Sequence, residues 1–294
     1  MSGDITLVTH RALAEGFIDD RLLADALASS GHSSRFAVWD DPSVDWTLSS
    51  LTLIRSTWDY QLRPAQWFAW IDRVAAQTRL LNPAAALRWN SDKRYLSDLS
   101  GAGIAIVPTV FVKTRDDPDL AALCRREGWR DVVVKPAIGA SAHGTRRFKD
   151  ASIGQAGEAH LCALLAEGVA LVQPFQGAVE TELERSLVFL GPDFSHAFTK
   201  AAFSSGTAGD ETPLQPYEAS KQEIALGLAA LAAIPIASAY ARVDLVPAPE
   251  GPLLMELELV EPDLALRHDA GALRRFAKIC LTELGGGDPA ADAL

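Results

Sequence analysis

The sequence predicts an α/β protein, α+β overall, in which a parallel α/β unit comes first and two further subdomains follow. Three observations lead to this prediction. Short apolar strands alternate with amphipathic helices at the start of the chain, which is typical of a parallel sheet. A similar alternation continues through the middle of the chain. Nearer the C-terminus, strands follow one another around tight turns, which indicates antiparallel pairs.

The N-terminal unit is predicted from runs of apolar residues and from helical spacing. Its first helix has apolar residues three and four positions apart, and its second begins with proline, which suits the first helical position. The strands are expected at Asp4–His10, Arg35–Trp39 and Leu51–Arg55, and the helices at Asp19–Ser30 and Pro64–Thr78. The unit is expected to end near Asn82–Pro83.

The middle of the chain is predicted to alternate between helices and short strands. Ser91 is expected to cap a helix that continues to Leu99, because serine is a good N-cap and glycines follow at 101 and 103. Helices are also expected at Pro118–Glu127 and Gln155–Glu167, and strands at Val107–Val112, Asp131–Lys135 and Val169–Gln173. A loop with glycine and serine is expected at Ala137–Thr145.

The pattern then changes to strand pairs. One pair is expected at Glu184–Leu190 and Ser195–Ala202, and a hairpin at Ala239–Val246 and Leu253–Leu259. A polar loop, Ser204–Pro216, is expected to lead into a helix at Glu218–Ala233, and a last helix is expected at Ala270–Leu284.

Composition excludes several classes of protein. The chain of 294 residues has a formal net charge of −11, whereas general nucleic-acid binders are more often basic. Its three cysteines, at 124, 162 and 280, match neither a disulfide framework nor a zinc pattern. The first residues, MSGDITLVTH, lack the features of a signal peptide, and no apolar stretch is long enough to span a membrane. We therefore expect a cytoplasmic protein with no nucleic-acid or membrane partner.

The stretch LLMELELVEP places carboxylates at Glu256 and Glu258 within an apolar strand. Alternate strand residues share a face, so these two side chains point the same way, about 7 Å apart along the strand. Arg242 and Asp244 share a face of the preceding strand in the same manner. Oxygen ligands at this density suit Mg²⁺ or Mn²⁺ with a nucleotide phosphate as co-ligand. The alternative is a salt-bridged surface hairpin.

Lys135 ends the strand VVVKP and precedes the loop AIGASAHGT. Glycines in such a loop let the backbone approach an anion, and a neighbouring lysine suits a phosphate. The spacing of Gly139 and Gly144 matches a Walker A loop, but Thr145–Arg146 stands where lysine and serine or threonine are required. A plain surface lysine is the alternative interpretation of Lys135.

Taken in order from about residue 89 to 266, these motifs resemble the ATP-grasp superfamily of carboxylate–amine ligases. The resemblance implies an N-terminal domain at 1–88, a small ATP-grasp subdomain at 89–172 and a C-terminal ATP-grasp subdomain at 173–294. It implies ATP contacts at Lys93, Lys135, the loop residue Ser141, the hinge residues Gln173, Pro174 and Phe175, the acidic Glu184 and Lys200. Glu180 and Glu182 compete with Glu184 for the position near the ribose.

The same resemblance implies the reaction. Asp244 and Glu256 would bind magnesium, while Arg242 and Lys135 would act as catalytic residues on the phosphate that is transferred. Glu258 stands where many members have asparagine, so it would add a charge at the second metal. The expected activity is ATP-dependent activation of a small amino-acid-like carboxylate as an acyl phosphate, which an amine then attacks.

The combination of RSTWDY, RWNSDKRYL and ELELVEP resembles a bacterial branch that includes the D-cycloserine-forming cyclo-ligase, which closes the ring of O-ureido-D-serine. An intermolecular amino-acid or peptide ligase and a non-catalytic nucleotide-binding protein are the alternatives. Arg55, Trp58 and His143 are candidate substrate contacts; packing at a domain interface is the alternative for Trp58. Ligases of this superfamily are often dimers, so a homodimer is one expected assembly.

Overall fold

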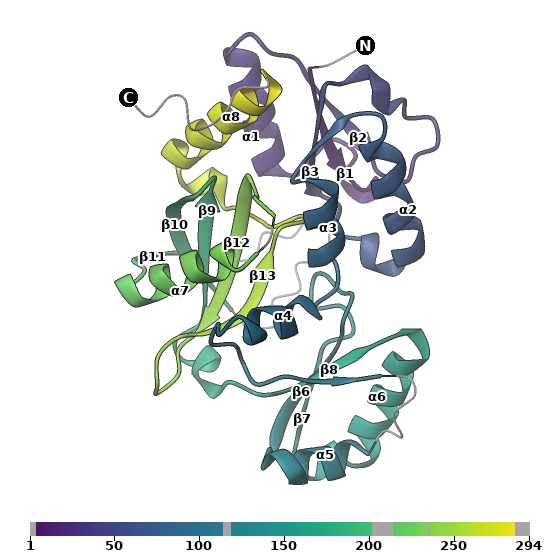
Figure 1. The fold of residues 1–294 in the computed structure, drawn as a ribbon, viewed down its shortest axis with the longest axis vertical. Helices are drawn as coiled ribbons and strands as arrows, with labels where there is room; N and C mark the ends of the chain where they lie inside the picture. Colours follow the sequence, from purple (N-terminus) through teal and green to yellow (C-terminus); the bar gives the residue numbers. More distant parts are fainter. Residues whose placement is uncertain (1–3, 114–118, 202–213, 235, 286–294) are drawn as a thin grey trace.

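The computed structural model describes residues 4–113, 119–201, 214–234 and 236–285. Within them the chain forms three sheets, one of four parallel strands and two that are antiparallel. In Figure 1 the N-terminal unit lies at the top, the C-terminal sheet in the centre and the middle sheet at the bottom. The predicted α/β class, with a parallel unit first, is confirmed.

The N-terminal sheet has the strand order β2-β1-β3-β4, and every neighbouring pair is parallel. Its core contains Trp67 and Trp70, which lie about one turn apart on the same helix. Their rings stack with the centroids 4.9 Å apart. The strands are β1 (Ile5–Thr9), β2 (Ser34–Val38), β3 (Leu51–Ser56) and β4 (Arg79–Leu81), and the helices are α1 (Ile18–Ser29), α2 (Pro64–Ala75) and α3 (Ala84–Asn90).

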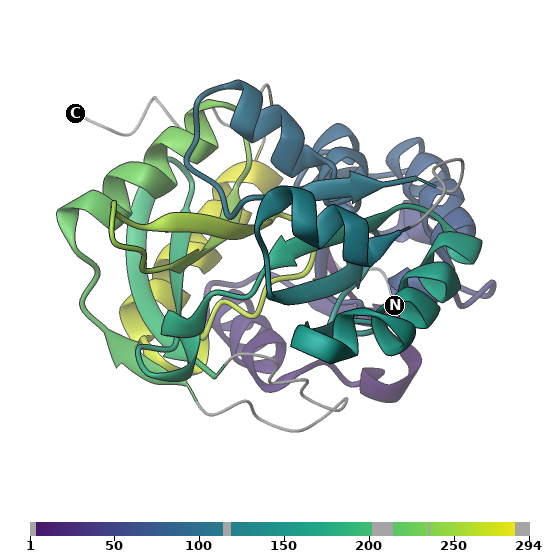
Figure 2. The same ribbon diagram turned by 90° about the horizontal axis from the view of Figure 1, so that it is seen from below.

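The middle sheet is antiparallel, in the order β5-β8-β6-β7. Helices α5 and α6 cover this sheet, and their apolar residues form one core with the strands; the teal helices in Figure 2 show this side from below. The strands are β5 (Val110–Val112), β6 (Asp131–Pro136), β7 (Arg146–Lys149) and β8 (Ala170–Pro174), and the helices are α4 (Tyr95–Gly101), α5 (Leu120–Glu127) and α6 (Gln155–Glu167).

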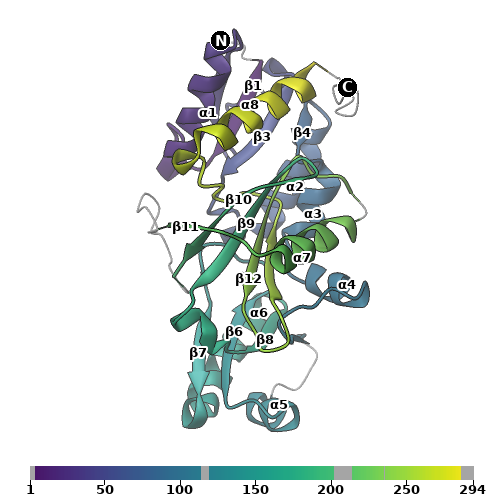
Figure 3. The same ribbon diagram turned by 90° about the vertical axis from the view of Figure 1, so that its left-hand side faces the viewer.

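The C-terminal sheet, in the order β11-β10-β9-β12-β13, is antiparallel and packs on both faces. One face lies against α7, where Gly227 leaves room for the Phe189 ring, and the other lies against α8 and the N-terminal unit. Figure 3 shows its long strands running between the N-terminal unit and the middle sheet. The elements are β9 (Glu184–Leu190), β10 (Asp193–Lys200), β11 (Gln215–Tyr217), α7 (Lys221–Ala232), β12 (Tyr240–Val246), β13 (Leu253–Glu258) and α8 (Ala270–Leu284).

Several expected elements differ from those observed. Ser91 does not cap a helix at its start; it ends α3, where its hydroxyl donates to the Leu87 carbonyl at 2.7 Å and accepts from Trp67. The alanine-rich helix α3 was not predicted, and neither were β4, β7 and β11. Val107 lies before β5, because its N–H donates instead to Leu254 of β13 at 2.9 Å.

Other expectations fall on residues that the structure does not describe. Residue 118, where a helix was expected to start, and residues 202–213 of the expected strand end and polar loop lie outside the described ranges. No helix in the described part of the chain is both long enough and apolar enough to cross a membrane.

Candidate active site

A pocket of about 270 Å³ lies where the three units meet. Residues from β6, β8, β10, β12 and β13 line it, together with the loop at 137–145 and residues 58, 60, 90 and 93. The pocket thus brings together most of the residues that the sequence singled out, although they are spread over two thirds of the chain. They are Trp58, Lys93, Lys135, Ser141, His143, Gln173, Pro174, Phe175, Glu184, Lys200, Arg242, Glu256 and Glu258.

The two acidic strands pair as the sequence predicted. β12 and β13 are antiparallel, with Arg242 opposite Glu258 and Asp244 opposite Glu256. Because paired residues on adjacent strands point to the same side, these four side chains converge on one sheet face. The alternative of a salt-bridged surface hairpin is thereby excluded, since Arg242 is 6% exposed and Asp244 is 1% exposed.

Asp244 lies beneath the pocket and does not line it. Both its oxygens are engaged: Arg242 donates to the two oxygens at 2.9 and 3.0 Å, while Ser186 and Lys200 donate at 2.7 and 2.9 Å. Burial alone would favour the neutral acid, but Arg242 and Lys200 outweigh it and lower the pKa of Asp244. In this arrangement Asp244 is saturated by protein donors.

Glu256 and Glu258 face the pocket and are each paired with one cation. The Lys93 ammonium lies 2.9 Å from a Glu256 oxygen, and the Arg242 guanidinium donates to Glu258. Burial opposes ionisation of Glu256, yet Lys93 and Lys135 lower its pKa, whereas burial prevails at Glu258 and raises its pKa.

The expected convergence of three carboxylates does not form a metal cage. In the ranges that the structure describes, no group of three or more histidine, cysteine or acidic side chains is arranged to hold a metal ion. The reason is that Arg242, Lys200 and Lys93 lie between the carboxylates. The oxygen donors that do face the pocket, on Glu256 and Glu258, fit a magnesium ion that brings phosphate oxygens with it.

Lys135 is a buried cation without a hydrogen-bond or ion-pair partner among the described residues. It is 8% exposed and lines the pocket beside the loop at 137–145. Burial lowers the pKa of its ammonium, Lys93 adds to that effect, and Glu256 opposes it. An incoming anion would relieve this cost, so the placement suits a phosphate contact and excludes a plain surface lysine.

The loop at 137–145 closes one side of the pocket. Gly144 adopts φ +69°, and a Cβ there would lie 3.2 Å from Pro136, so this position requires glycine. The Lys93 ammonium donates to the Gly139 carbonyl at 2.5 Å, which ties the loop to the acidic strand through Glu256. Ser141 and His143 of this loop line the pocket.

The end of strand β8 and the residue that follows it lie at an apolar end of the pocket. Gln173, Pro174 and Phe175 line it together with the apolar side chains of Val107, Val133, Val179 and Met255. The Phe175 N–H donates to the Asp131 carbonyl at 2.9 Å, so this group is engaged within the protein. The Gln173 amide donates to the Thr109 hydroxyl at 2.8 Å. The apolar side chains at this end suit an aromatic base.

Of the three acidic residues that competed for one position, only Glu184 lines the pocket. Burial raises its pKa to about 7, although the Lys200 ammonium, 2.6 Å away, opposes that shift. Glu180 is exposed and pairs with Arg147, and Glu182 pairs with Arg185. The tertiary structure therefore separates candidates that the sequence could not.

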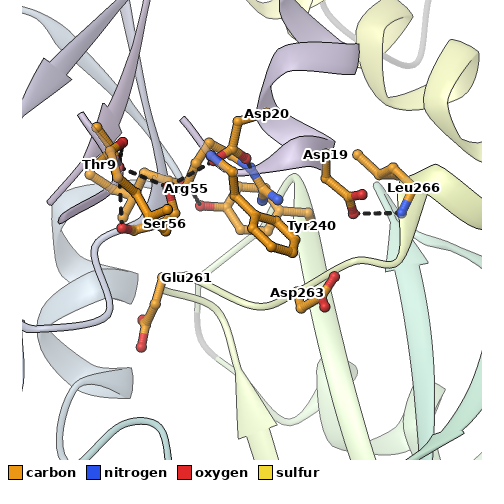
Figure 4. A network of polar contacts seen from close by, with 12 residues as sticks. Thr9, Asp19, Asp20, Arg55, Ser56, Tyr240, Glu261, Asp263 and Leu266 are labelled. Carbon is orange, nitrogen blue, oxygen red and sulfur yellow. Dashed lines mark hydrogen bonds and ion pairs between the residues drawn. The ribbon is translucent and has the colours of Figure 1, made fainter. Parts of the chain in front are cut away.

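Arg55 does not lie among the residues that line the pocket. Its guanidinium is 3% exposed and pairs with Asp20 of α1 at 2.9 Å, as Figure 4 shows. The expected role of Arg55 in holding a substrate is corrected accordingly, because a buried arginine with its own carboxylate is a structural group. Trp58 does line the pocket, and its indole N–H donates to the Glu261 carbonyl at 3.0 Å.

Sequence reasoning missed several residues of the site, among them Glu261 and Asn90. Glu261 was visible as the third acid of ELELVEP but lies outside the alternation of the strand. Asn90 was visible within RWN, and its amide bonds to both Leu257 and Leu259, directly beside the two acidic residues of β13. No local pattern distinguishes such an asparagine from one on the surface.

Comparison with known proteins identifies the family. Residues 5–82 match the N-terminal domain of the D-cycloserine synthetase DcsG. The cycloserine biosynthesis protein DcsG of Streptomyces lavendulae is 32% identical over 291 residues, which cover 94% of this chain and 97% of DcsG.

Two solved structures extend the likeness to the fold. The crystal structure of D-cycloserine synthetase DcsG has a TM-score of 0.86 at 31% identity, covering 95% of this chain and 99% of that one. A RimK domain ATP-grasp protein of Sphaerobacter thermophilus has a TM-score of 0.70 at 18% identity, covering 94% and 98%. The resemblance inferred from the motifs is confirmed, and the chain belongs to the ATP-grasp ligase family of the D-cycloserine synthetase DcsG.

Proposed function

We propose that this protein is an ATP-dependent cyclo-ligase that forms D-cycloserine from O-ureido-D-serine. The observation that carries the proposal is the 32% identity with DcsG of Streptomyces lavendulae across almost the whole of both chains. The arrangement of the pocket supports it, with an apolar end for a base, a free buried lysine and an acidic strand pair.

The chemistry follows from the poor electrophilicity of a carboxylate. Transfer of the terminal phosphate of ATP to the substrate carboxylate yields an acyl phosphate and ADP. A nitrogen of the same molecule then attacks the acyl carbon and expels phosphate, which closes the ring. Hydrolysis of the carbamoyl group, which D-cycloserine lacks, consumes one water and releases carbon dioxide and ammonia.

The protein contributes charge and alignment to these steps. Lys135 would bind phosphate oxygens with its unpartnered ammonium, and Lys93 would hold the loop at 137–145 over them through Gly139. Arg242, held in place by Asp244, would neutralise charge on the transferring phosphate. Glu256 and Glu258 would hold magnesium, which would supply further charge neutralisation when bound. The closed pocket would exclude water, which would otherwise hydrolyse the acyl phosphate.

The test is magnesium-dependent ADP release by the purified full chain with O-ureido-D-serine, with D-cycloserine identified by mass spectrometry. A panel of D- and L-amino acids and dipeptides is assayed in parallel. Lys135→Ala and Glu256→Gln are expected to lower kcat/KM by about 100-fold or more, because each removes charge next to the phosphates. Glu250→Gln, an exposed change in the β12–β13 turn, is the matched control and should retain activity.

The outcomes separate the candidate functions. ADP release with formation of D-cycloserine supports the cyclo-ligase. Release that requires two amino acids and yields a dipeptide would replace it with an intermolecular ligase. Nucleotide binding without turnover of any substrate in the panel would contradict the proposal and favour a non-catalytic protein.

A further inference from the structure

Glu261 is a buried acid that points into the pocket with no partner for its carboxyl group. The residue is 8% exposed and lines the pocket just after β13. Its backbone carbonyl accepts from Trp58, but within the described residues no hydrogen bond or ion pair reaches its side chain. In Figure 4 its carboxyl group points away from the network around Arg55, and no dashed line reaches it.

This isolation sets Glu261 apart from its neighbours. Each other acid described at the pocket has a cation: Lys200 for Glu184, Lys93 for Glu256 and Arg242 for Glu258. Asp263, two residues further on, pairs with Arg267. Among the lysines and arginines that line the pocket in the described ranges, Lys135 alone lacks such a partner. Within the described ranges the pocket therefore holds one unpaired cation, Lys135, beside the loop at 137–145, and one unpaired acid, Glu261.

The surroundings of Glu261 favour an organic cation as its partner. Burial, followed by repulsion from Glu258 and Glu256, raises the pKa of Glu261 well above its usual value, although Lys93 opposes the shift. Phe17, Trp58 and Tyr60 line the same pocket and supply aromatic walls. Aromatic faces attract ammonium groups, whereas magnesium selects several oxygen ligands.

We propose that Glu261 binds the primary ammonium group of the amino-acid substrate and so selects α-amino acids over plain carboxylic acids. The proposal rests on the proposed function and deepens it. A substrate held in this way by its ammonium group has its carboxylate free to face the Lys135 side of the pocket, where the phosphate is expected. The Trp58 hydrogen bond to the Glu261 backbone fixes the acid against the aromatic wall.

The test compares two ligands on two proteins. Calorimetry measures binding of O-ureido-D-serine and of its analogue without the α-amino group to the full chain loaded with a non-hydrolysable ATP analogue. Wild-type protein is expected to bind the amino acid about 10- to 100-fold more tightly, as for a hydrogen bond to a charged group. In Glu261→Gln this preference should fall to about twofold or less, with affinity for the nucleotide analogue unchanged.

Two controls exclude a loss of folding as the cause. Glu250→Gln should keep the full preference, and Glu261→Asp, which retains the charge, should keep part of it. Retained nucleotide binding in Glu261→Gln shows that the pocket is formed. A Glu261→Gln protein that still prefers the amino acid as strongly as wild type would overturn the proposal.

Failure of the proposed function gives a different result. If O-ureido-D-serine does not bind but another amino acid of the panel does, the cyclo-ligase assignment fails. The comparison is then made between that amino acid and its analogue without the amino group, and loss of the preference in Glu261→Gln still supports the ammonium site. If no amino acid of the panel binds to the nucleotide-loaded wild type, the ammonium site is overturned as well.

Discussion

Most charged side chains that line the pocket in the described ranges already pair with one another, Lys135 and Glu261 excepted. Lys93 forms an ion pair with Glu256, and Arg242 forms one with Glu258. The same two carboxylates are the ones that would bind the metal cations that accompany a nucleotide. Leaving an acid buried without a partner costs several kcal/mol, so these pairs stabilise the pocket before any ligand binds. A cation that binds to the pocket must therefore replace Lys93 or Arg242 as the partner of an acid. Glu256 and Glu258 are the acids best placed for this exchange.

His196 offers a pH dependence that can be measured without knowing the substrate. It lies on β10, where its Nε2 lies 2.8 Å from the Leu264 carbonyl, and burial lowers its pKa below 6.5 while Leu264 and Asp269 oppose that shift. The folded state then binds fewer protons than the unfolded chain as pH falls below 6.5. We expect the free energy of unfolding to fall over that range.

The change to examine is His196→Gln, which keeps an N–H near Leu264 but does not titrate. Its denaturant-unfolding free energy should depend less on pH between 7.5 and 5 than that of wild type. His268→Gln, at an exposed histidine, is the control and should follow wild type. Equal slopes for His196→Gln and wild type would contradict the assignment of this dependence to His196.

At the scale of elements, β13 is an edge strand whose free edge is covered by other segments. Asn90 donates to the Leu257 carbonyl at 2.8 Å and accepts from the Leu259 N–H at 2.6 Å, and Tyr95 accepts from the Leu257 N–H at 3.0 Å. Ala105 and Val107 bond to Leu254 further along. Side chains of α3 and α4 thus replace a neighbouring strand and fix the direction of Glu256 and Glu258.

Asn90→Ala should therefore affect both stability and activity. It leaves a buried N–H and a buried carbonyl of β13 unpaired, which we expect to cost about 2–4 kcal/mol of unfolding free energy. Magnesium-dependent ADP release should fall as well, because the acidic side chains lose their fixed direction. Gln77→Ala, at an exposed amide, is the control. Unchanged stability and activity in Asn90→Ala would show that the edge needs no such cover.

At the scale of the whole molecule, polar contacts join the N-terminal unit to the C-terminal sheet. The Tyr240 hydroxyl lies 3.0 Å from the carbonyls of both Ile54 and Val260, and the Asn82 amide donates to the Tyr240 and Leu259 carbonyls at 2.9 Å. Asp19 of α1 accepts from the Leu266 N–H at 2.7 Å, as Figure 4 shows. An apolar core of both units surrounds these contacts.

We therefore expect the N-terminal unit and the C-terminal sheet to unfold together. Tryptophan fluorescence, to which the cluster of Trp39, Trp67 and Trp70 in the first unit contributes strongly, should give the same guanidinium midpoint as far-UV circular dichroism. Tyr240→Phe should lower both midpoints equally, by an amount equivalent to about 1 kcal/mol. Two separate transitions would show that the units are only loosely joined.

The sequence by itself determined the order of the motifs and the local geometry of the acidic strands. Strand alternation has a period of two, so Glu256 and Glu258 share a face whatever surrounds them. The same local reasoning placed Lys135 at a strand end and predicted the pairing of β12 with β13. It missed α3, because a helix of seven residues spans only about two turns and shows little apolar periodicity.

Only the tertiary structure decided which charges have partners. Arg55 pairs with Asp20, 35 residues away, and Asp244 pairs with Lys200, 44 residues away. Glu261, in contrast, has no such side-chain partner among the described residues and faces the pocket. Asn90 reaches β13 from 167 residues earlier in the chain. These contacts depend on how distant segments pack against each other, and residue spacing along the chain contains no record of that packing.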